Sequence, residues 1–278
     1  MNRIVATALC AALLSLSVGC FSDHTTIKLN PDGSGTLISV TMMKSKAIQQ
    51  MKEMAKAFGG ENAKEPEFFT EKEAKEKAAK MGEGVQFVSR EAVKEKDAEG
   101  QKVVYSFKDI TKLKINEVSD PPGGEGAPKA EAKKGEPITF KFAKLANGNS
   151  LLTIVNPKMD LKPKEGEDPK EKDPAAAPQG EVPEEQLAMM KEMMGGLKVS
   201  IQIELAGKVV QSNSSHAKDS TVTILEMDFD KVLGDAPKLK KLMAAQPKTP
   251  EEAKALMKGF PGVKFNFEPE TTVEFSGK

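Results

Sequence analysis

The chain has 278 residues and equal numbers of basic and acidic side chains, 41 of each, so it lacks the basic excess with which nucleic-acid-binding proteins displace counterions. One Tyr and no Trp argue against surfaces that stack sugars or single-stranded bases. Two His and two Cys are too few for a zinc site of the usual four-ligand kind, and we expect neither a metal nor a cofactor.

The first twenty residues have the pattern of an export signal. Arg3 supplies a short basic start, and residues 4–19 are apolar or small throughout. This run is shorter than the roughly 20 residues of a membrane-spanning helix and fits the apolar region of a signal peptide. Leu16-Ser17-Val18-Gly19-Cys20 resembles the bacterial lipoprotein signal, in which the cysteine is acylated and becomes the new N-terminus.

The resemblance implies that residues 1–19 are removed and that Cys20 carries the lipid, with palmitate among its acyl chains. Several acyl chains anchor a protein far more firmly than one. Cys10 leaves with the signal, so the mature chain cannot form an internal disulfide. In enteric bacteria an Asp after the cysteine retains lipoproteins in the inner membrane, and Phe21 here favours the outer membrane. A secretory peptide cut elsewhere and a plain membrane anchor remain the alternatives.

The segment after the signal predicts two hairpins separated by two helices. Turn residues at 30–35 separate predicted strands at 25–29 and 36–42. Apolar residues spaced by three and four predict a helix over residues 44–58.

Thr70 and Glu73 form a capping box that opens a second helix, which Gly82 ends. Predicted strands at 85–93 and 102–107 then flank a second turn.

Two low-complexity segments are predicted to be loop insertions without a packed core. Residues 121–137 and 157–183 are rich in Pro, Gly, Ala, Glu and Lys and poor in large aliphatic side chains. Between them, residues 138–142 and 150–155 predict a third hairpin around Asn147-Gly148-Asn149. Because a lone hairpin is marginal in water, we expect it to dock onto the rest of the chain.

The C-terminal part repeats this style. Strict alternation of apolar residues predicts a half-buried strand at 197–205, which Ala206-Gly207 turns into residues 208–211. Another strand is predicted at 222–227. Predicted helices complete the region at 184–194, 235–246 and 250–258.

Residues 70–87 and 249–265 share a faint pattern, Thr-x-x-Glu-Ala-Lys followed by Gly-Val-x-Phe. Duplication of a helix–strand unit is one interpretation, and convergence of two short units on the same residues is the other. The sequence does not decide between them.

Several groups of residues invite a chemical interpretation, and each has a structural one that we favour. Asn30, Asp32 and Ser34 imitate a calcium loop, but position twelve is Thr41 where a bidentate Glu is needed, which favours a hairpin turn. His216 lies in a Ser-rich loop near Asp219, where a turn is favoured over a catalytic triad.

Two further clusters, of methionines and of carboxylates, also have both a chemical and a structural interpretation. The paired methionines of the helix at 184–194 suit Cu(I) chemically, but filling an irregular core is the favoured role. They are Met189, Met190, Met193 and Met194, and Met51 with Met54 form a further pair. Glu226, Asp228 and Asp230 alternate along a strand end, which favours a solvated face or a helix cap over acid–base catalysis.

Residues 105–113 and 207–213 resemble segments of uncharacterised bacterial lipoproteins. The resemblance implies an α+β lipoprotein and no activity. We therefore expect one α+β domain over residues 20–278, with a largely antiparallel sheet built from hairpins and several helices packed on it. Two lobes, at 20–156 and 184–278, are the alternative organisation.

The expected function is that of a lipid-anchored cell-envelope protein acting as a non-enzymatic binding or scaffolding module. A carrier of a small apolar or lipid ligand is the alternative, and a hydrolase is a third hypothesis. The expected partners are the membrane, through Cys20, and an envelope protein or lipid, but not nucleic acid.

Overall fold

The computed structural model describes residues 21–59, 67–116, 136–157, 191, 195–235, 237–239, 250–266 and 268–277. The predicted signal, the acylation site Cys20 and nearly all of both predicted insertions lie outside these residues, as do all the methionines of the predicted helix at 184–194. The chain divides into two compact units. The larger comprises Cys20–Pro157, Lys198–Glu226 and Lys264–Lys278, and the smaller comprises Met1–Gly19, Lys158–Leu197 and Met227–Val263.

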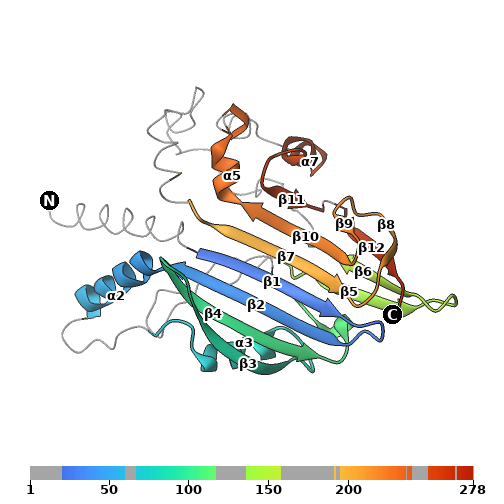
Figure 1. Ribbon diagram of the computed structural model, residues 1–278, viewed down its shortest axis with the longest axis horizontal. Coiled ribbons are helices and arrows are strands. Elements are labelled where there is room, and N and C mark those ends of the chain that lie inside the picture. Colours follow the sequence, from blue (N-terminus) through green and yellow to red (C-terminus); the bar gives the residue numbers. More distant parts are fainter. Residues whose placement is uncertain are drawn as a thin grey trace, which may run out of the picture. The chain divides into compact units, whose positions relative to one another are not determined.

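An eight-stranded sheet dominates the described residues, and its strands follow the order β11-β10-β7-β1-β2-β4-β3, with β9 paired to β10 (Figure 1). The strands are β1 (Phe21–Leu29), β2 (Gly35–Lys44), β3 (Gln86–Lys94), β4 (Ala98–Phe107), β7 (Lys198–Leu205), β9 (Ala217–Lys218), β10 (Thr221–Asp228) and β11 (Val263–Phe265). The first two predicted hairpins are confirmed as the antiparallel pairs β1–β2 and β3–β4.

A four-stranded sheet in the order β5-β6-β12-β8 forms the second layer of strands. It contains β5 (Thr139–Lys144), β6 (Ser150–Val155), β8 (Val209–Ser212) and β12 (Glu270–Phe275). The third predicted hairpin is confirmed as β5–β6, and it docks as expected because β6 pairs with β12. Strand β8 follows β7 in sequence but pairs with β12 in this second sheet.

The predicted largely antiparallel character is confirmed, with one parallel exception. Strand β1 pairs in parallel with β7 from Ser22↔Lys198 to Leu29↔Leu205, while its other edge pairs with β2. The first strand of the described chain is therefore central in the sheet, and it joins the N-terminal hairpins to the C-terminal strands.

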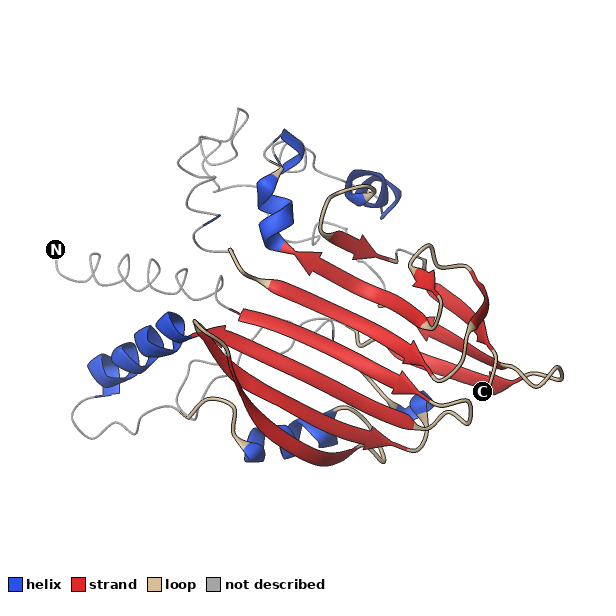
Figure 2. Cartoon of the chain, in the orientation of Figure 1, coloured by secondary structure: helices blue, strands red, loops and turns tan. Residues whose placement is uncertain are grey.

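Helices are few among the described residues, and strands exceed them (Figure 2). They are α2 (Ser45–Gly59), α3 (Glu71–Lys80), the 3-10 turn η2 (Ile110–Lys112), α5 (Phe229–Gly234) and α7 (Pro250–Met257). The predicted capping box of α3 is confirmed: the Glu73 amide donates to the Thr70 hydroxyl at 3.2 Å, and the Thr70 amide donates to the Glu73 carboxylate at 3.1 Å.

One apolar core is shared by both sheets, α3 and η2 in the larger unit. Ile27, Leu37 and Ile203 from the large sheet and Leu152 and Val273 from the small one are fully buried in it. The predicted alternation of β7 is confirmed, because every second residue from its middle onward is buried.

The smaller unit has an apolar cluster of its own. Val232, Leu233, Leu239 and Phe260 are buried there. Asp228 caps α5, since its carboxylate accepts a hydrogen bond from the Lys231 amide at 3.3 Å.

The two similar segments end at opposite edges of the large sheet, since one leads into β3 and the other into β11. Gly84 and Gly262 precede these strands, and both have φ of +80°. A Cβ at Gly262 would lie 2.7 Å from the Asp228 carbonyl oxygen, whereas a Cβ at Gly84 would meet open space. The shared glycine thus meets different surroundings in the two segments.

Gly100 of β4 leaves no room for a side chain beside β2, because a Cβ there would lie 1.9 Å from the Thr41 carbonyl oxygen. We expect Gly100→Ala to lower the free energy of unfolding by about 1–3 kcal/mol, as overpacking of a filled site does. Gly234→Ala is the matched control, because no atom beyond its own helical turn and chain neighbours lies within 4 Å of its Cβ position. Urea denaturation of both variants measures the difference, and equal stabilities would contradict the close approach.

Candidate functional site

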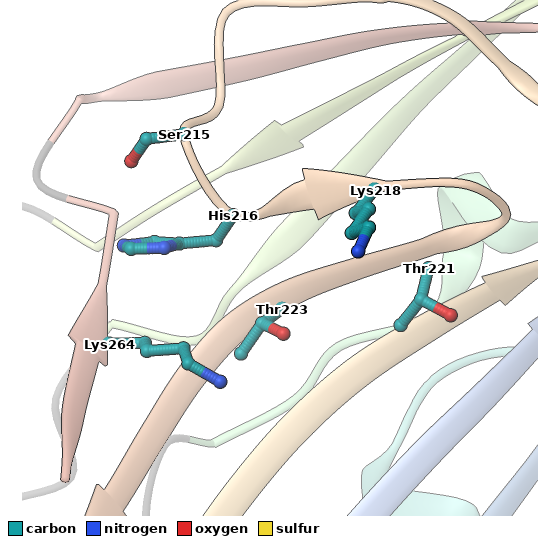
Figure 3. A pocket seen from close by; sticks show the side chains of 6 residues that line it. All are labelled: Ser215, His216, Lys218, Thr221, Thr223 and Lys264. Atoms are coloured by element: carbon teal, nitrogen blue, oxygen red, sulfur yellow. The ribbon is translucent and has the colours of Figure 1, made fainter.

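A polar pocket of about 240 Å³ lies on the large sheet where β9, β10 and β11 meet. Three hydroxyl groups, two ammonium groups and one imidazole line it. They belong to Ser215, Thr221, Thr223, Lys218, Lys264 and His216. Figure 3 shows the Lys218 and Lys264 side chains on either side of Thr223.

Backbone pairing fixes these side chains. The Thr223 amide donates to the His216 carbonyl at 3.0 Å, and Thr221 pairs with Lys218 across β10 and β9. Lys264 reaches the pocket from β11 and forms a 2.7 Å ion pair with Glu226 of β10. Lys218 forms no ion pair with another described residue.

The pocket offers donors to an anion or to a hydroxylated ligand, and the Lys264–Glu226 pair weakens its positive charge. No carboxylate lines it beside the imidazole, and among the described residues the His216 ring forms no hydrogen bond with the hydroxyl groups of the pocket.

The loop that invited a triad interpretation is built from turn hydrogen bonds, as predicted. The Ser212 hydroxyl accepts from the Ser214 amide at 3.0 Å, and the Ser214 hydroxyl accepts from the His216 amide at 3.1 Å. The Ser212 hydroxyl also donates to the Thr272 carbonyl of β12 at 2.9 Å. Asp219 occupies the left-handed region with φ of +56°, which Asp tolerates better than most residues. Ser212 thus holds the loop against β12, and Ser214 closes a turn within the loop.

The three alternating carboxylates also have structural partners. Glu226 pairs with Lys264, Asp228 caps α5, and Asp230 accepts a hydrogen bond from the Gly196 amide at 2.8 Å. The predicted helix-cap role is confirmed at Asp228.

The calcium-like segment is the turn of the β1–β2 hairpin, as predicted. The Asp32 carboxylate accepts from the amide of Ser34 at 3.0 Å and from its hydroxyl at 2.6 Å. These hydrogen bonds lower the pKa of Asp32. The carboxylate therefore closes the turn, and the described residues contain no group of three or more His, Cys, Asp or Glu that could hold a metal ion.

A polar stretch of the buried sheet face was not predicted. Asp23, Thr25, Ser39 and Thr41 are buried on β1 and β2, in the half of the strands nearest Cys20. The Ser39 hydroxyl donates to the Asp23 carboxylate at 3.4 Å. The sequence contained this signal, because Asp23 and Thr25 stand at the same alternate positions of β1 as the later apolar residues Ile27 and Leu29.

Tyr105 lies further along the same sheet face on β4, fully buried beside the apolar core. Burial, and then the nearby Asp23 charge, raise the pKa of Tyr105 to about 12. Both effects penalise the phenolate, which keeps the side chain neutral over the physiological range.

The raised pKa predicts a stability that falls in alkali. Between pH 10 and about 12 the unfolded chain releases the tyrosine proton while the folded chain retains it, so the free energy of unfolding decreases with rising pH. The loss reaches about 2–3 kcal/mol by pH 12 and is absent below pH 9. Because Tyr105 is the only tyrosine and Trp is absent, phenolate absorbance reports it alone.

Tyr105→Phe is the control for this titration, because it keeps the ring and removes the proton. Between pH 10 and 12 the unfolding free energy of this variant should lack the decrease caused by tyrosine ionisation and keep any decrease caused by lysine deprotonation. Native absorbance titrating near pH 10 would contradict the burial of the phenol.

Helices of the described residues are all too short or too polar to span a bilayer.

Met51 is partly buried against a small apolar cluster.

No protein-family model matches the sequence, and no curated protein is similar enough to count as a relative. Among solved structures, the folded domain of LppM from Mycobacterium tuberculosis, determined by NMR, is similar with a TM-score of 0.32 and 9% identity. The match covers 94% of this chain and 92% of that chain. A TM-score this low carries no conclusion about family or function.

The polar pocket predicts weak, local anion binding. At constant pH, inorganic phosphate should shift the ring proton resonances of His216 and leave those of His24, which lies on β1, unchanged. Lys218→Ala should weaken the effect, whereas Lys28→Ala, on β1 and paired with Glu204, should not. Equal shifts at both histidines would show that phosphate does not bind in the pocket.

Proposed function

We propose that the chain is a lipid-anchored cell-envelope protein that acts as a non-enzymatic binding or scaffolding module. One observation carries the proposal: β1 begins at Phe21, directly after the predicted acylation site Cys20, and is the central strand of the large sheet. An acyl anchor on Cys20 is then joined to the sheet without a spacer.

Because no spacer separates Cys20 from β1, the sheet would be held at the membrane surface and could not extend far from it. Consecutive Cα atoms lie about 3.8 Å apart, so an anchor on Cys20 holds the end of β1 at the membrane surface. Both edges of β1 are paired, to β2 and to β7, and the large sheet is held with it. Such an attachment suits a protein that presents a surface at the membrane.

The non-enzymatic part of the proposal is supported by the roles of the polar side chains. The candidate serines and carboxylates hold turns, caps and ion pairs. Among the described residues, no hydroxyl group of the polar pocket is hydrogen-bonded to the His216 imidazole, and no carboxylate lines the pocket to orient that ring. Covalent hydrolysis needs a nucleophile hydrogen-bonded to its base, together with donors for the developing oxyanion.

The carrier alternative requires an apolar cavity. The polar pocket on β9, β10 and β11 presents hydroxyl, ammonium and imidazole groups, and it gives this alternative no support. Purification of the protein from detergent-solubilised envelope, followed by lipid analysis of the eluate, separates the two functions. A stoichiometric co-purified lipid would favour the carrier, and a stoichiometric protein partner would favour the scaffold.

Cys20→Ala tests the anchor. We expect the variant to lose incorporation of a fatty-acid analogue completely and to accumulate as the unprocessed precursor, because the acylated thiol is gone. Cys10→Ala is the matched control, since this cysteine lies within the predicted signal and its loss should leave labelling unchanged. Undiminished labelling of Cys20→Ala would overturn the lipid-anchor proposal.

A further inference from the structure

A small apolar cluster lies apart from the main core, and we call it the strand-end cluster. Met43, Ala47 and Phe69 are buried in it, and four more apolar side chains are only partly buried against it. These four are Phe21, Ile48, Met51 and Phe68. More of its members are partly exposed than buried, so the described residues leave the cluster incompletely covered.

The strand-end cluster lies at the end of the sheet where the predicted lipid anchor attaches. Phe21, the residue after Cys20, pairs with Met43 near the end of β2. Helix α2 begins two residues later, at Ser45, and Figure 1 shows it extending past the end of the sheet at which β1 begins. The anchor and the apolar cluster are therefore neighbours.

Two members of the cluster, Phe68 and Phe69, come from a segment with a strained backbone. Phe69 has φ of +62°, a left-handed conformation that bulky residues rarely adopt, and its ring is buried in the cluster. Phe68, beside it, remains partly exposed. The chain thus keeps two consecutive aromatic rings at this end of the sheet against a local conformational cost.

The charge of α2 suits an anionic lipid surface. The helix carries Lys46, Lys52 and Lys56 against a single Glu53, and Lys44 precedes it. The neighbouring turn between β3 and β4 carries both signs and adds no basic excess. Lysines near a membrane surface are attracted electrostatically to anionic phospholipids. Helices with an apolar stripe and a basic face lie along such surfaces.

We infer that the strand-end cluster and α2 contact the bilayer, with Phe21, Ile48, Met51 and Phe68 entering the interface beside the acyl chains of Cys20. The inference rests on the proposed lipid anchor. The strand-end cluster and α2 form a second contact, which fixes the tilt of the sheet on a bilayer containing anionic phospholipids. An acyl anchor alone would leave the protein free to rotate about its attachment point.

Depth-dependent fluorescence quenching tests this contact on the full acylated protein. Acylation consumes the Cys20 thiol and Cys10 leaves with the signal, so one introduced cysteine is the only free thiol. An environment-sensitive fluorophore is placed in separate variants by Met51→Cys, Glu53→Cys and Val88→Cys. Vesicles of phosphatidylethanolamine and phosphatidylglycerol carry a quencher at the boundary of headgroups and acyl chains.

The two control positions separate insertion from mere proximity. Glu53 is exposed two residues beyond Met51 on α2, and Val88 is 55% exposed on β3, toward the opposite end of the sheet. An interfacial helix buries its apolar face by about 5–10 Å, so quenching and a blue shift should be strong at 51, weaker at 53 and absent at 88. Circular dichroism of each variant verifies the fold, and Ile48→Cys replaces Met51→Cys if that variant unfolds.

Mass spectrometry of Cys20 in the same preparation distinguishes the two possible failures. Acylated Cys20 with quenching at 51 no greater than at 88 would overturn the bilayer contact and leave the lipid anchor standing. A Cys20 without acyl chains would overturn the anchor and with it the inference. Equal quenching at 51 and 53 would show proximity without insertion and would also overturn the contact.

Discussion

Pairing of β1 along both edges is the constraint on which the larger unit depends. Its antiparallel partner β2 follows in sequence, but its parallel partner β7 lies 176 residues away. Through β7 the C-terminal strands enter the same sheet as the N-terminal hairpins. The shared core then closes on residues from both halves, such as Leu37 and Ile203. Without this pairing the hairpins would keep their local order but lose the surface that buries their apolar faces.

Local features of this fold could be predicted from the sequence, and distant pairings could not. The hairpin turns, the Thr70 capping box and the alternation of β7 each depend on residues close together in the chain. The β1–β7 pair and the pairing of β8 with β12 in the second sheet depend on which strands meet. Alternation of apolar residues indicates that one face of a strand is buried, but it does not indicate which strand pairs with it. Strand β12 was missed although Thr271, Val273 and Phe275 alternate, because no turn signal as clear as that of the other hairpins flanks it.

The candidate site shows the same limit. Turn chemistry correctly predicted the roles of the Ser-rich loop and of Asp228, since hydrogen bonds two or three residues apart are local. The pocket needs Lys264 to reach β10 from a strand about forty residues away in sequence, which no local pattern indicates. The buried polar stretch around Asp23 was legible as a period of two, but its burial follows from the central position of β1.

The same pairing sets the order in which the chain can acquire its structure. A hairpin such as β1–β2 closes a short loop, whereas β1–β7 must wait for a distant segment, and contacts of long sequence separation form slowly. In an exported chain β7 also arrives late, because its residues cross the membrane after those of β1. If Cys20 is the acylated residue, the acylating and cleaving enzymes meet β1 while one of its edges is still open. Lipid attachment then precedes closure of the sheet, and the protein completes its folding already tethered.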